Sequence, residues 1–167
     1  MDAKHTFFRF LPFLLVTMLT LQACDPGFDE YCIIRNNTSQ TVTVVPSGHH
    51  YVRQNDTEVF DTFDYHPATI AAGADSVVMY NGGIGASSYE QAFYLICQYL
   101  GDSVIFRFED GNQIIFHSTD TVGISPYNPY ATCYHWEEKV GKPYAGHVYF
   151  GSLTFTIGNE HYQEATQ

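Results

Sequence analysis

Basic side chains are scarce in this sequence. Its 167 residues include only 7 lysines and arginines against 18 aspartates and glutamates, which gives a formal net charge of −11. The first 23 residues contain Asp2, Lys4 and Arg9, so the rest of the chain carries 17 acidic and 5 basic residues, a charge of −12. A surface of this sign repels phosphate groups, which argues against binding to DNA, RNA or anionic lipid headgroups.

Catalytic motifs are missing as well. The chain has no Gly-x-Ser-x-Gly nucleophile elbow, and solvation in a turn or along a strand explains the paired acids at 109–110 and 137–138. The glycine-rich stretch 82–85 lies between an expected strand and an expected helix. It matches neither phosphate-binding pattern, because position 88 is serine and no lysine follows. We expect no catalytic residues, and a small hydrolase is the least favoured hypothesis.

Metal-ligand spacing is missing among the 8 histidines. His49 and His50 are neighbours, and neighbouring side chains on an extended segment point to opposite faces, so they would not easily share an ion, with or without His66. The chain also has no Cys-x-x-Cys pair, which excludes a thioredoxin-like redox role. We therefore expect no metal ion and no cofactor.

The longest apolar run, 10–21, is too short to span a bilayer comfortably and contains Pro12 and two threonines. It follows Lys4 and Arg9 and ends beside the small residue Ala23. A basic flank, a short apolar run and a small residue are typical of a cleaved signal peptide, which we place at 1–23.

The four residues Leu21-Gln22-Ala23-Cys24 resemble the lipobox of bacterial lipoproteins, which is cut before a lipidated cysteine. The resemblance implies a membrane anchor at Cys24, where each buried methylene of the acyl chains contributes about 0.8 kcal/mol. An ordinary secretory signal followed by a coincidental cysteine is the alternative. We expect an acidic tether at 24–30 and a single domain at 31–167.

Three cysteines remain in an exported and therefore oxidising setting. One disulfide and one buried thiol is the natural outcome, with three pairings open. We favour Cys97 with Cys133, since Cys97 lies on the apolar side of an expected helix and Cys133 opens a strand that the helix could cover. Cys32 would then be the thiol, and a Cys32–Cys97 or Cys32–Cys133 bridge is the alternative.

Most of the remaining sequence has β character. β-Branched runs at 32–35 and 41–45 flank the turn formers 36–39 and predict a hairpin. Residues 46–68 are expected to form a long loop or an excursion at a sheet edge, and 75–80 a strand. Strands at 103–108 and 112–117 flank Asp110-Gly111, a strong hairpin signal. A loop at 119–132 precedes strands at 134–140 and 147–157.

One amphipathic helix is expected at about 88–100. Ser88 and Gln91 form a capping box, and Gly101 ends the helix. Apolar residues recur along one face at Tyr89, Ala92, Phe93, Ile96, Cys97 and Leu100. The pattern predicts a mostly β fold: an antiparallel, sandwich-like domain with one helix packed on it.

Aromatic residues crowd the C-terminal third of the chain. Aromatic faces beside amides and carboxylates hold sugar rings and also form protein contact surfaces. The competing interpretation is that half of these rings pack in the core or on edge strands. The candidates for binding are Tyr127, Tyr130, Tyr134, Trp136 and Tyr144.

Three tripeptides beginning at Asp75, Asp102 and Asp120 resemble the O-glycosylation sequon of exported Bacteroidota proteins, with Ser76, Ser103 and Thr121 as acceptors. Asp29-Glu30 after the lipobox resembles the surface-export signal of lipoproteins from that phylum. Together with the stretch 36–44 near the start of the β-rich region, these features make the chain similar to small cell-envelope lipoproteins of gut Bacteroidota. No activity is known for that group. The resemblance implies an outer-membrane, surface-exposed location.

Three hypotheses follow. The first is a lipid-anchored envelope protein whose domain binds a glycan or a protein without catalysis. The second is a scaffold or accessory subunit of an outer-membrane complex, in which the aromatic surface meets a partner protein. The third is the small hydrolase.

Overall fold

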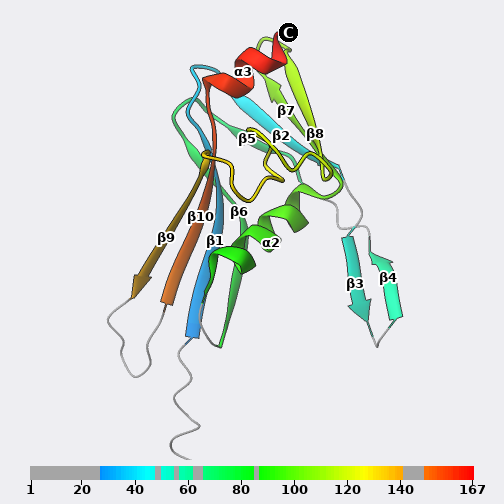
Figure 1. Cartoon of the computed structure of the whole chain (residues 1–167), viewed down its shortest axis with the longest axis vertical. Coiled ribbons are helices and arrows are strands. Elements are labelled where there is room, and N and C mark those ends of the chain that lie inside the picture. Colours follow the sequence, from blue (N-terminus) through cyan, green and yellow to red (C-terminus); the bar gives the residue numbers. More distant parts are fainter. Residues whose placement is uncertain (1–26, 48–49, 55–56, 62–65, 85–86, 141–148) are drawn as a thin grey trace, which may run out of the picture.

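The computed structural model describes residues 27–47, 50–54, 57–61, 66–84, 87–140 and 149–167. Ten strands and two helices lie within these ranges (Figure 1). In chain order they are β1 (Gly27–Asn36), β2 (Val42–Ser47), β3 (His50–Gln54), β4 (Thr57–Asp61), β5 (Ala68–Ile70), β6 (Asp75–Ile84), α2 (Tyr89–Leu100), β7 (Ser103–Phe108), β8 (Gln113–His117), β9 (Tyr134–Val140), β10 (Tyr149–Ile157) and α3 (Asn159–Ala165). Neither described helix is long and apolar enough to cross a membrane.

Two four-stranded sheets form the domain. The first has the order β6-β1-β10-β9 and the second β5-β2-β7-β8, while β3 and β4 pair only with each other in a separate hairpin. Helix α2 lies across the first sheet and contacts β1, β6 and β10 (Figure 1). The predicted mostly β, sandwich-like fold with one amphipathic helix is confirmed. One detail differs, because β1 and β10 run parallel while every other paired strand is antiparallel.

The core lies between the two sheets. The inward residues alternate along each strand, as in β10, where Leu153, Phe155 and Ile157 are buried. The rings of Phe155 in the first sheet and Phe106 in the second lie 5.9 Å apart, so side chains from both sheets meet directly. Burying a large apolar side chain contributes about 1.5–3 kcal/mol, and this layer is the main source of stability.

Helix α2 begins and ends where the sequence predicts. The Ser88 side chain accepts a hydrogen bond from the Gln91 amide at 3.2 Å. At the other end Gly101 adopts φ 71°, a conformation that glycine tolerates best, and its amide bonds to the Cys97 carbonyl. Ala92, Ile96 and Leu100 are buried along the expected face.

The predicted β7–β8 hairpin is also confirmed. Val104 pairs with Phe116 and Phe106 with Ile114, as the alternation indicates. Gly111 has φ 90° in the turn. The predicted strand at 75–80 and the last two strands are likewise present as β6, β9 and β10.

The predicted hairpin between 32–35 and 41–45 is wrong. The corresponding strands, β1 and β2, belong to different sheets. The reason lies in Asn36, whose side chain is buried and donates hydrogen bonds to the carbonyls of Gln40, at 2.7 Å, and Ile70, at 2.9 Å. Thr38 in turn bonds to the Asn36 carboxamide oxygen at 2.7 Å. The turn formers therefore carry the chain from one sheet to the other.

The predicted tether at 24–30 is too long. Strand β1 begins at Gly27, and both Phe28 and Glu30 are buried. The Ser87 hydroxyl donates to Glu30 Oε1 at 2.8 Å, just before the N-cap of α2. An acidic residue is favourable beside a helix N-terminus, so Glu30 belongs to the fold and the domain starts before residue 31. The signal peptide and Cys24 lie outside the described residues.

Two further elements were not predicted. The segment 46–68, expected to be a loop or an excursion at a sheet edge, contains the β3–β4 hairpin and β5. Helix α3 at the C-terminus is too short to show a helical period. It is started by a local contact, in which the Gly158 amide donates to His161 Nδ1 at 3.1 Å.

Candidate functional site

Four of the five aromatic residues predicted to bind lie in described segments, and they differ in exposure. Tyr127 is buried, Tyr130 is 90% exposed, and Tyr134 and Trp136 are partly buried at the start of β9. Tyr144 lies outside the described residues. Of the four described residues, only Tyr130 is largely exposed.

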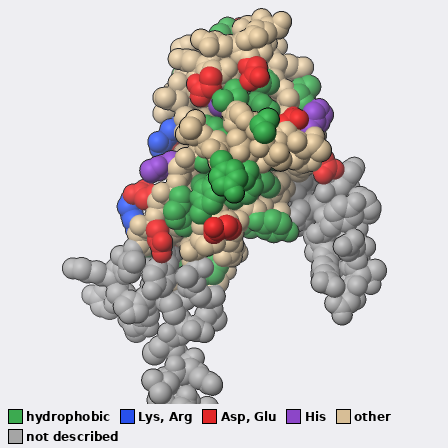
Figure 2. All heavy atoms as spheres, in the orientation of Figure 1, with side chains coloured by type: hydrophobic (Ala, Val, Ile, Leu, Met, Phe, Trp, Pro, Cys, Tyr) green, Lys and Arg blue, Asp and Glu red, His purple; other side chains and the backbone are tan. Residues whose placement is uncertain are grey.

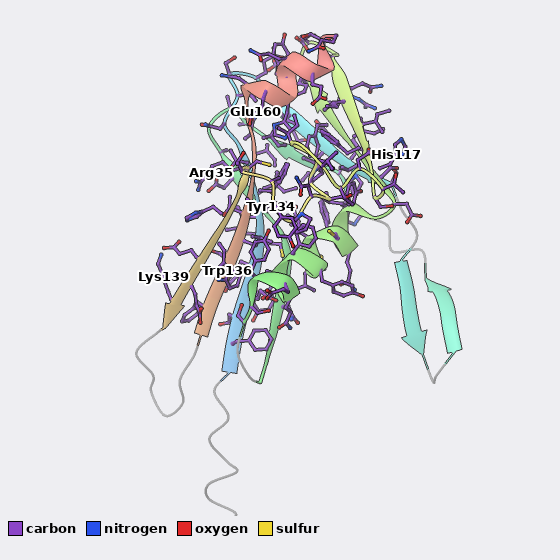
Figure 3. All side chains as sticks on the ribbon, viewed as in Figure 1. Arg35, His117, Tyr134, Trp136, Lys139 and Glu160 are labelled. Carbon is purple, nitrogen blue, oxygen red and sulfur yellow. The ribbon has the colours of Figure 1, made fainter. Side chains whose placement is uncertain are left out.

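Tyr134 and Trp136 instead join an aromatic cluster with Tyr89 and Phe93 of α2. The ring centroids of Phe93 and Tyr134 are 5.5 Å apart and those of Tyr89 and Trp136 are 6.4 Å apart, both edge to face. Figure 3 shows Tyr134 and Trp136 lying between β9 and α2. The rings are used to pack the helix against the sheet edge.

The aromatic cluster also holds the loop 119–132. The Tyr134 hydroxyl donates to the Pro126 carbonyl at 2.5 Å, and the Tyr89 hydroxyl donates to the Pro129 carbonyl. Burial raises the pKa of both phenols, so they remain protonated donors at neutral pH. Hydrogen bonds from two tyrosine hydroxyls therefore hold the loop against the aromatic cluster.

A cavity of about 520 Å³ is bordered by the first half of this loop. We call it the β8 cavity, because its walls are β8, the first half of the loop and one residue of α3. The lining residues are Ile114, Ile115, Phe116, Thr119, Asp120, Thr121, Val122, Gly123, Ile124, Ser125 and Glu164. Its volume is within the range of ligand-binding pockets, about 300–1,000 Å³.

The β8 cavity has a mixed lining of aliphatic side chains, hydroxyls and two carboxylates. Ile115 is 46% exposed and Val122 is 77% exposed, while Asp120 and Glu164 supply carboxylates. No lysine or arginine is among its lining residues. Figure 2 shows apolar side chains interspersed with acidic ones over the upper part of this face. In Figure 1, β8 and α3 lie toward the end of the molecule opposite the start of β1.

Hydrogen bonds fix the cavity walls. Asp120 caps the end of β8: its carboxylate accepts from the His117 amide at 2.6 Å and its own amide donates to the His117 carbonyl at 2.8 Å. Further along, the Asn128 side chain donates to the Gly123 carbonyl at 2.8 Å. The exposed valine, Val122, is therefore presented by a loop held at both ends.

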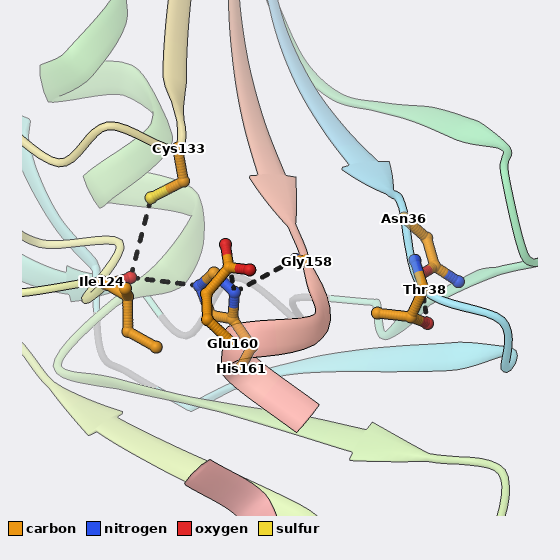
Figure 4. Close-up of polar contacts among 7 residues, drawn as sticks. All are labelled: Asn36, Thr38, Ile124, Cys133, Gly158, Glu160 and His161. Atoms are coloured by element: carbon orange, nitrogen blue, oxygen red, sulfur yellow. Dashed lines mark hydrogen bonds and ion pairs between the residues drawn. The ribbon is translucent and has the colours of Figure 1, made fainter. Parts of the chain in front are cut away.

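His161 ties the loop to α3 (Figure 4). Its Nδ1 accepts from the Gly158 amide, so its Nε2 carries the proton and donates to the Ile124 carbonyl at 3.1 Å. The ring is fully buried against Phe106, Phe116 and Phe155. Burial lowers the pKa of His161, although the neighbouring Glu160 and Glu164 act in the opposite direction. A neutral imidazole therefore closes this end of the core.

Cys32, Cys97 and Cys133 are free thiols in this structure, and the predicted Cys97–Cys133 disulfide stays a prediction. The Cys133 thiol is directed to the Ile124 carbonyl at 3.7 Å, and the Cys32 thiol donates to the Ala92 carbonyl at 3.3 Å. Burial raises the pKa of Cys32 and Cys97 to about 12 and that of Cys133 to about 11. They are poor nucleophiles and behave as small apolar residues.

The predicted glycosylation acceptors lie in different settings. Ser76 is part of β6, and Ser103 is in β7, where its side chain bonds to that of Ser47. Thr121 is exposed on the loop and lines the β8 cavity. Their modification stays a prediction.

The described residues show no cluster of three or more His, Cys, Asp or Glu side chains that could hold a metal ion. Gly82 and Gly83, part of the glycine-rich stretch, belong to β6. His49 lies outside the described residues.

The residues of the β8 cavity were missed by the sequence reasoning. The sequence does contain a sign of an exposed apolar edge at this strand. Ile115 is an apolar residue that points outward between the inward Ile114 and Phe116, and the strand has no Lys, Arg, Asp or Glu. In comparisons with known proteins, no family model and no curated protein matches this chain.

Proposed function

We propose that this chain is a lipoprotein of the cell envelope, anchored through Cys24, whose domain binds another protein without catalysis. The observation that supports it best is the β8 cavity, where Ile115 and Val122 are exposed beside a formed hollow. Exposed apolar surface around a formed hollow is typical of recognition sites.

The shortness of the tether indicates which end of the domain would lie near the membrane. Only Cys24, Asp25 and Pro26 precede β1, and three residues span about 10 Å at most. A lipid on Cys24 would hold the beginning of β1 close to the bilayer. The aromatic side chains of Tyr31 and Tyr80, whose ring centroids are 5.2 Å apart, belong to the strands at this end. The β8 cavity would then face away from the membrane, where a partner can reach it.

The chemistry of the cavity favours a protein over a glycan. Sugar sites need exposed ring faces, but the aromatic cluster packs its rings against one another. The exposed apolar lining of the β8 cavity is aliphatic, with Ile115 and Val122. An accessory subunit of an outer-membrane complex would use the same surface, so that hypothesis is one form of this proposal.

The first experiment tests the anchor. Wild type and Cys24→Ser are fractionated, and the variant is expected to leave the membrane fraction or to accumulate as uncut precursor. A wild-type protein that is cut elsewhere and found free in the periplasm contradicts the anchor.

The second experiment tests binding. Full-length protein is crosslinked in cells and co-purified from membranes, with Val122→Asp as the test and Val77→Asp as the control. Val77 is also an exposed valine, but it lies on β6 outside the cavity. We expect a partner that is lost with Val122→Asp and kept with Val77→Asp. Binding on a glycan array with no protein partner would point to the glycan alternative.

A further inference from the structure

Strand β8 forms one edge of the second sheet, and its register shows which backbone groups face outward. The Phe108 amide donates to the Asn112 carbonyl at 2.8 Å, and the Ser118 amide donates to the Asp102 carbonyl at 2.8 Å. In an antiparallel pair, bonded and non-bonded positions alternate. The even-numbered residues of β8 therefore bond to β7, and Gln113, Ile115 and His117 direct their amides and carbonyls away from it.

In two of these three residues the backbone amide and carbonyl have no hydrogen-bond partner among the described residues. Asp120 satisfies both the amide and the carbonyl of His117. For Gln113 and Ile115, no hydrogen bond from another described residue reaches either backbone group. The outer edge of β8 thus offers two donors and two acceptors beside the β8 cavity.

Strand β9, at the edge of the first sheet, is protected against pairing with another strand by its charged side chains. Strand β9 carries Glu137, Glu138 and Lys139, and Lys139 pairs with Glu137 at 2.8 Å. Charges of this kind discourage pairing with another strand. Strand β8 has none, and its central outward side chain is Ile115.

We propose that an extended peptide segment of a partner protein adds to β8 as a fifth strand of the second sheet. This inference rests on the proposed function and specifies how the partner is held. The Ile115 amide donates to a peptide carbonyl, and the Ile115 carbonyl accepts from a peptide amide. A strand added about 4.8 Å from β8 falls within the space of the cavity, where Val122 contacts its apolar side chains.

The carboxylates at the rim of the cavity indicate which kind of peptide it binds. Asp120 and Glu164 border the cavity, which has no lysine or arginine among its lining residues. A peptide that alternates apolar residues with a lysine or arginine complements this rim. A second copy of the chain does not, because without residues 1–23 it brings a net charge of −12 and the same acidic rim.

The test uses proline as a backbone probe. Ile115→Pro removes the outward amide without touching the bonds to β7, and edge strands tolerate proline at such positions. Ile115→Thr is the matched control, since it shortens the side chain but keeps the amide. Full-length protein in detergent is used to select from a displayed library of random linear peptides, and the selected peptides are titrated against each form.

The expected result is a set of peptides with alternating apolar and basic residues that bind Ile115→Thr within about threefold of wild type and Ile115→Pro at least tenfold more weakly. Selected peptides that bind Ile115→Pro as tightly as wild type overturn strand addition but leave protein binding intact. Failure to select any peptide, or a wild-type dimer that Ile115→Pro abolishes, overturns the inference as well. Loss of the co-purified partner is a separate readout and decides the proposed function.

Should Ile115→Pro fail to fold, as judged by circular dichroism, Gln113→Pro replaces it. That substitution removes the other outward amide of β8, with Gln113→Thr as its control. The same tenfold loss is expected for Gln113→Pro, and unchanged binding again overturns the inference.

Discussion

The aromatic cluster and the β8 cavity both contain apolar side chains, and both adjoin the loop 119–132. In the cluster, the rings of Tyr89, Phe93, Tyr134 and Trp136 pack against one another, and the two tyrosine hydroxyls donate hydrogen bonds to the loop. At the cavity, Ile115 and Val122 have no such cover. Composition alone points to the first region as the binding site, whereas packing points to the second. Substitutions in the cluster should therefore change stability, and those at the cavity should change binding.

The largest effect is expected for Tyr134→Ala. It removes a ring that contacts both Phe93 and Phe155, and we expect a loss of roughly 3 kcal/mol in the free energy of unfolding. Tyr134→Phe is the control and should lose only about 1 kcal/mol, the value of the bond to Pro126. Urea unfolding measures both. A loss below 1 kcal/mol for the alanine variant would return Tyr134 to the list of binding residues.

An intermediate effect is expected for Gly151→Ala. A Cβ at this position would lie 2.5 Å from Trp136 Cη2 and 2.1 Å from the Ser87 hydroxyl oxygen. Overpacking of this kind costs about 1–3 kcal/mol. At Gly27 the nearest atom would be 3.5 Å away, so Gly27→Ala should be close to neutral. Equal melting temperatures for the two variants would show that Trp136 is not packed as described.

A smaller effect is expected from pH, through His161. Because burial lowers its pKa in the folded state below the ordinary 6.5, the unfolded chain takes up the proton first as pH falls. The contribution of the neutral His161 to the free energy of unfolding is complete above about pH 6.5. Below that pH it decreases by at most about 1.4 kcal/mol per pH unit, until the folded-state pKa of His161 is reached. Unfolding at pH 7.5 and 5.5 should show a steeper decrease for wild type than for His161→Gln. Parallel decreases would contradict this role of the imidazole.

The elements that the sequence predicts well are those with local rules. The capping serine Ser88, the Gly101 stop and the Asp110-Gly111 turn depend on neighbours within a few residues, and α2 and the β7–β8 hairpin follow them. The alternation in β10 also marks its buried face correctly.

The errors come from contacts between residues that are distant in sequence. The Asn36 side chain bonds to Ile70, which turns an expected hairpin into a passage between sheets. Glu30 looks like part of a soluble tether until Ser87 is seen bonded to it. The open edge of β8 depends on strand order, which no local pattern contains.

Amide hydrogen exchange at Ile115 tests the central claim most directly. In the free protein the Ile115 amide faces away from β7 and should exchange far faster than its neighbours Ile114 and Phe116, which bond to β7. Adding a peptide selected on the protein should slow exchange at Ile115 and leave the two neighbours unchanged. An Ile115 amide that is already protected in the free protein, or one that stays fast at peptide saturation, would contradict an open edge that binds by strand addition.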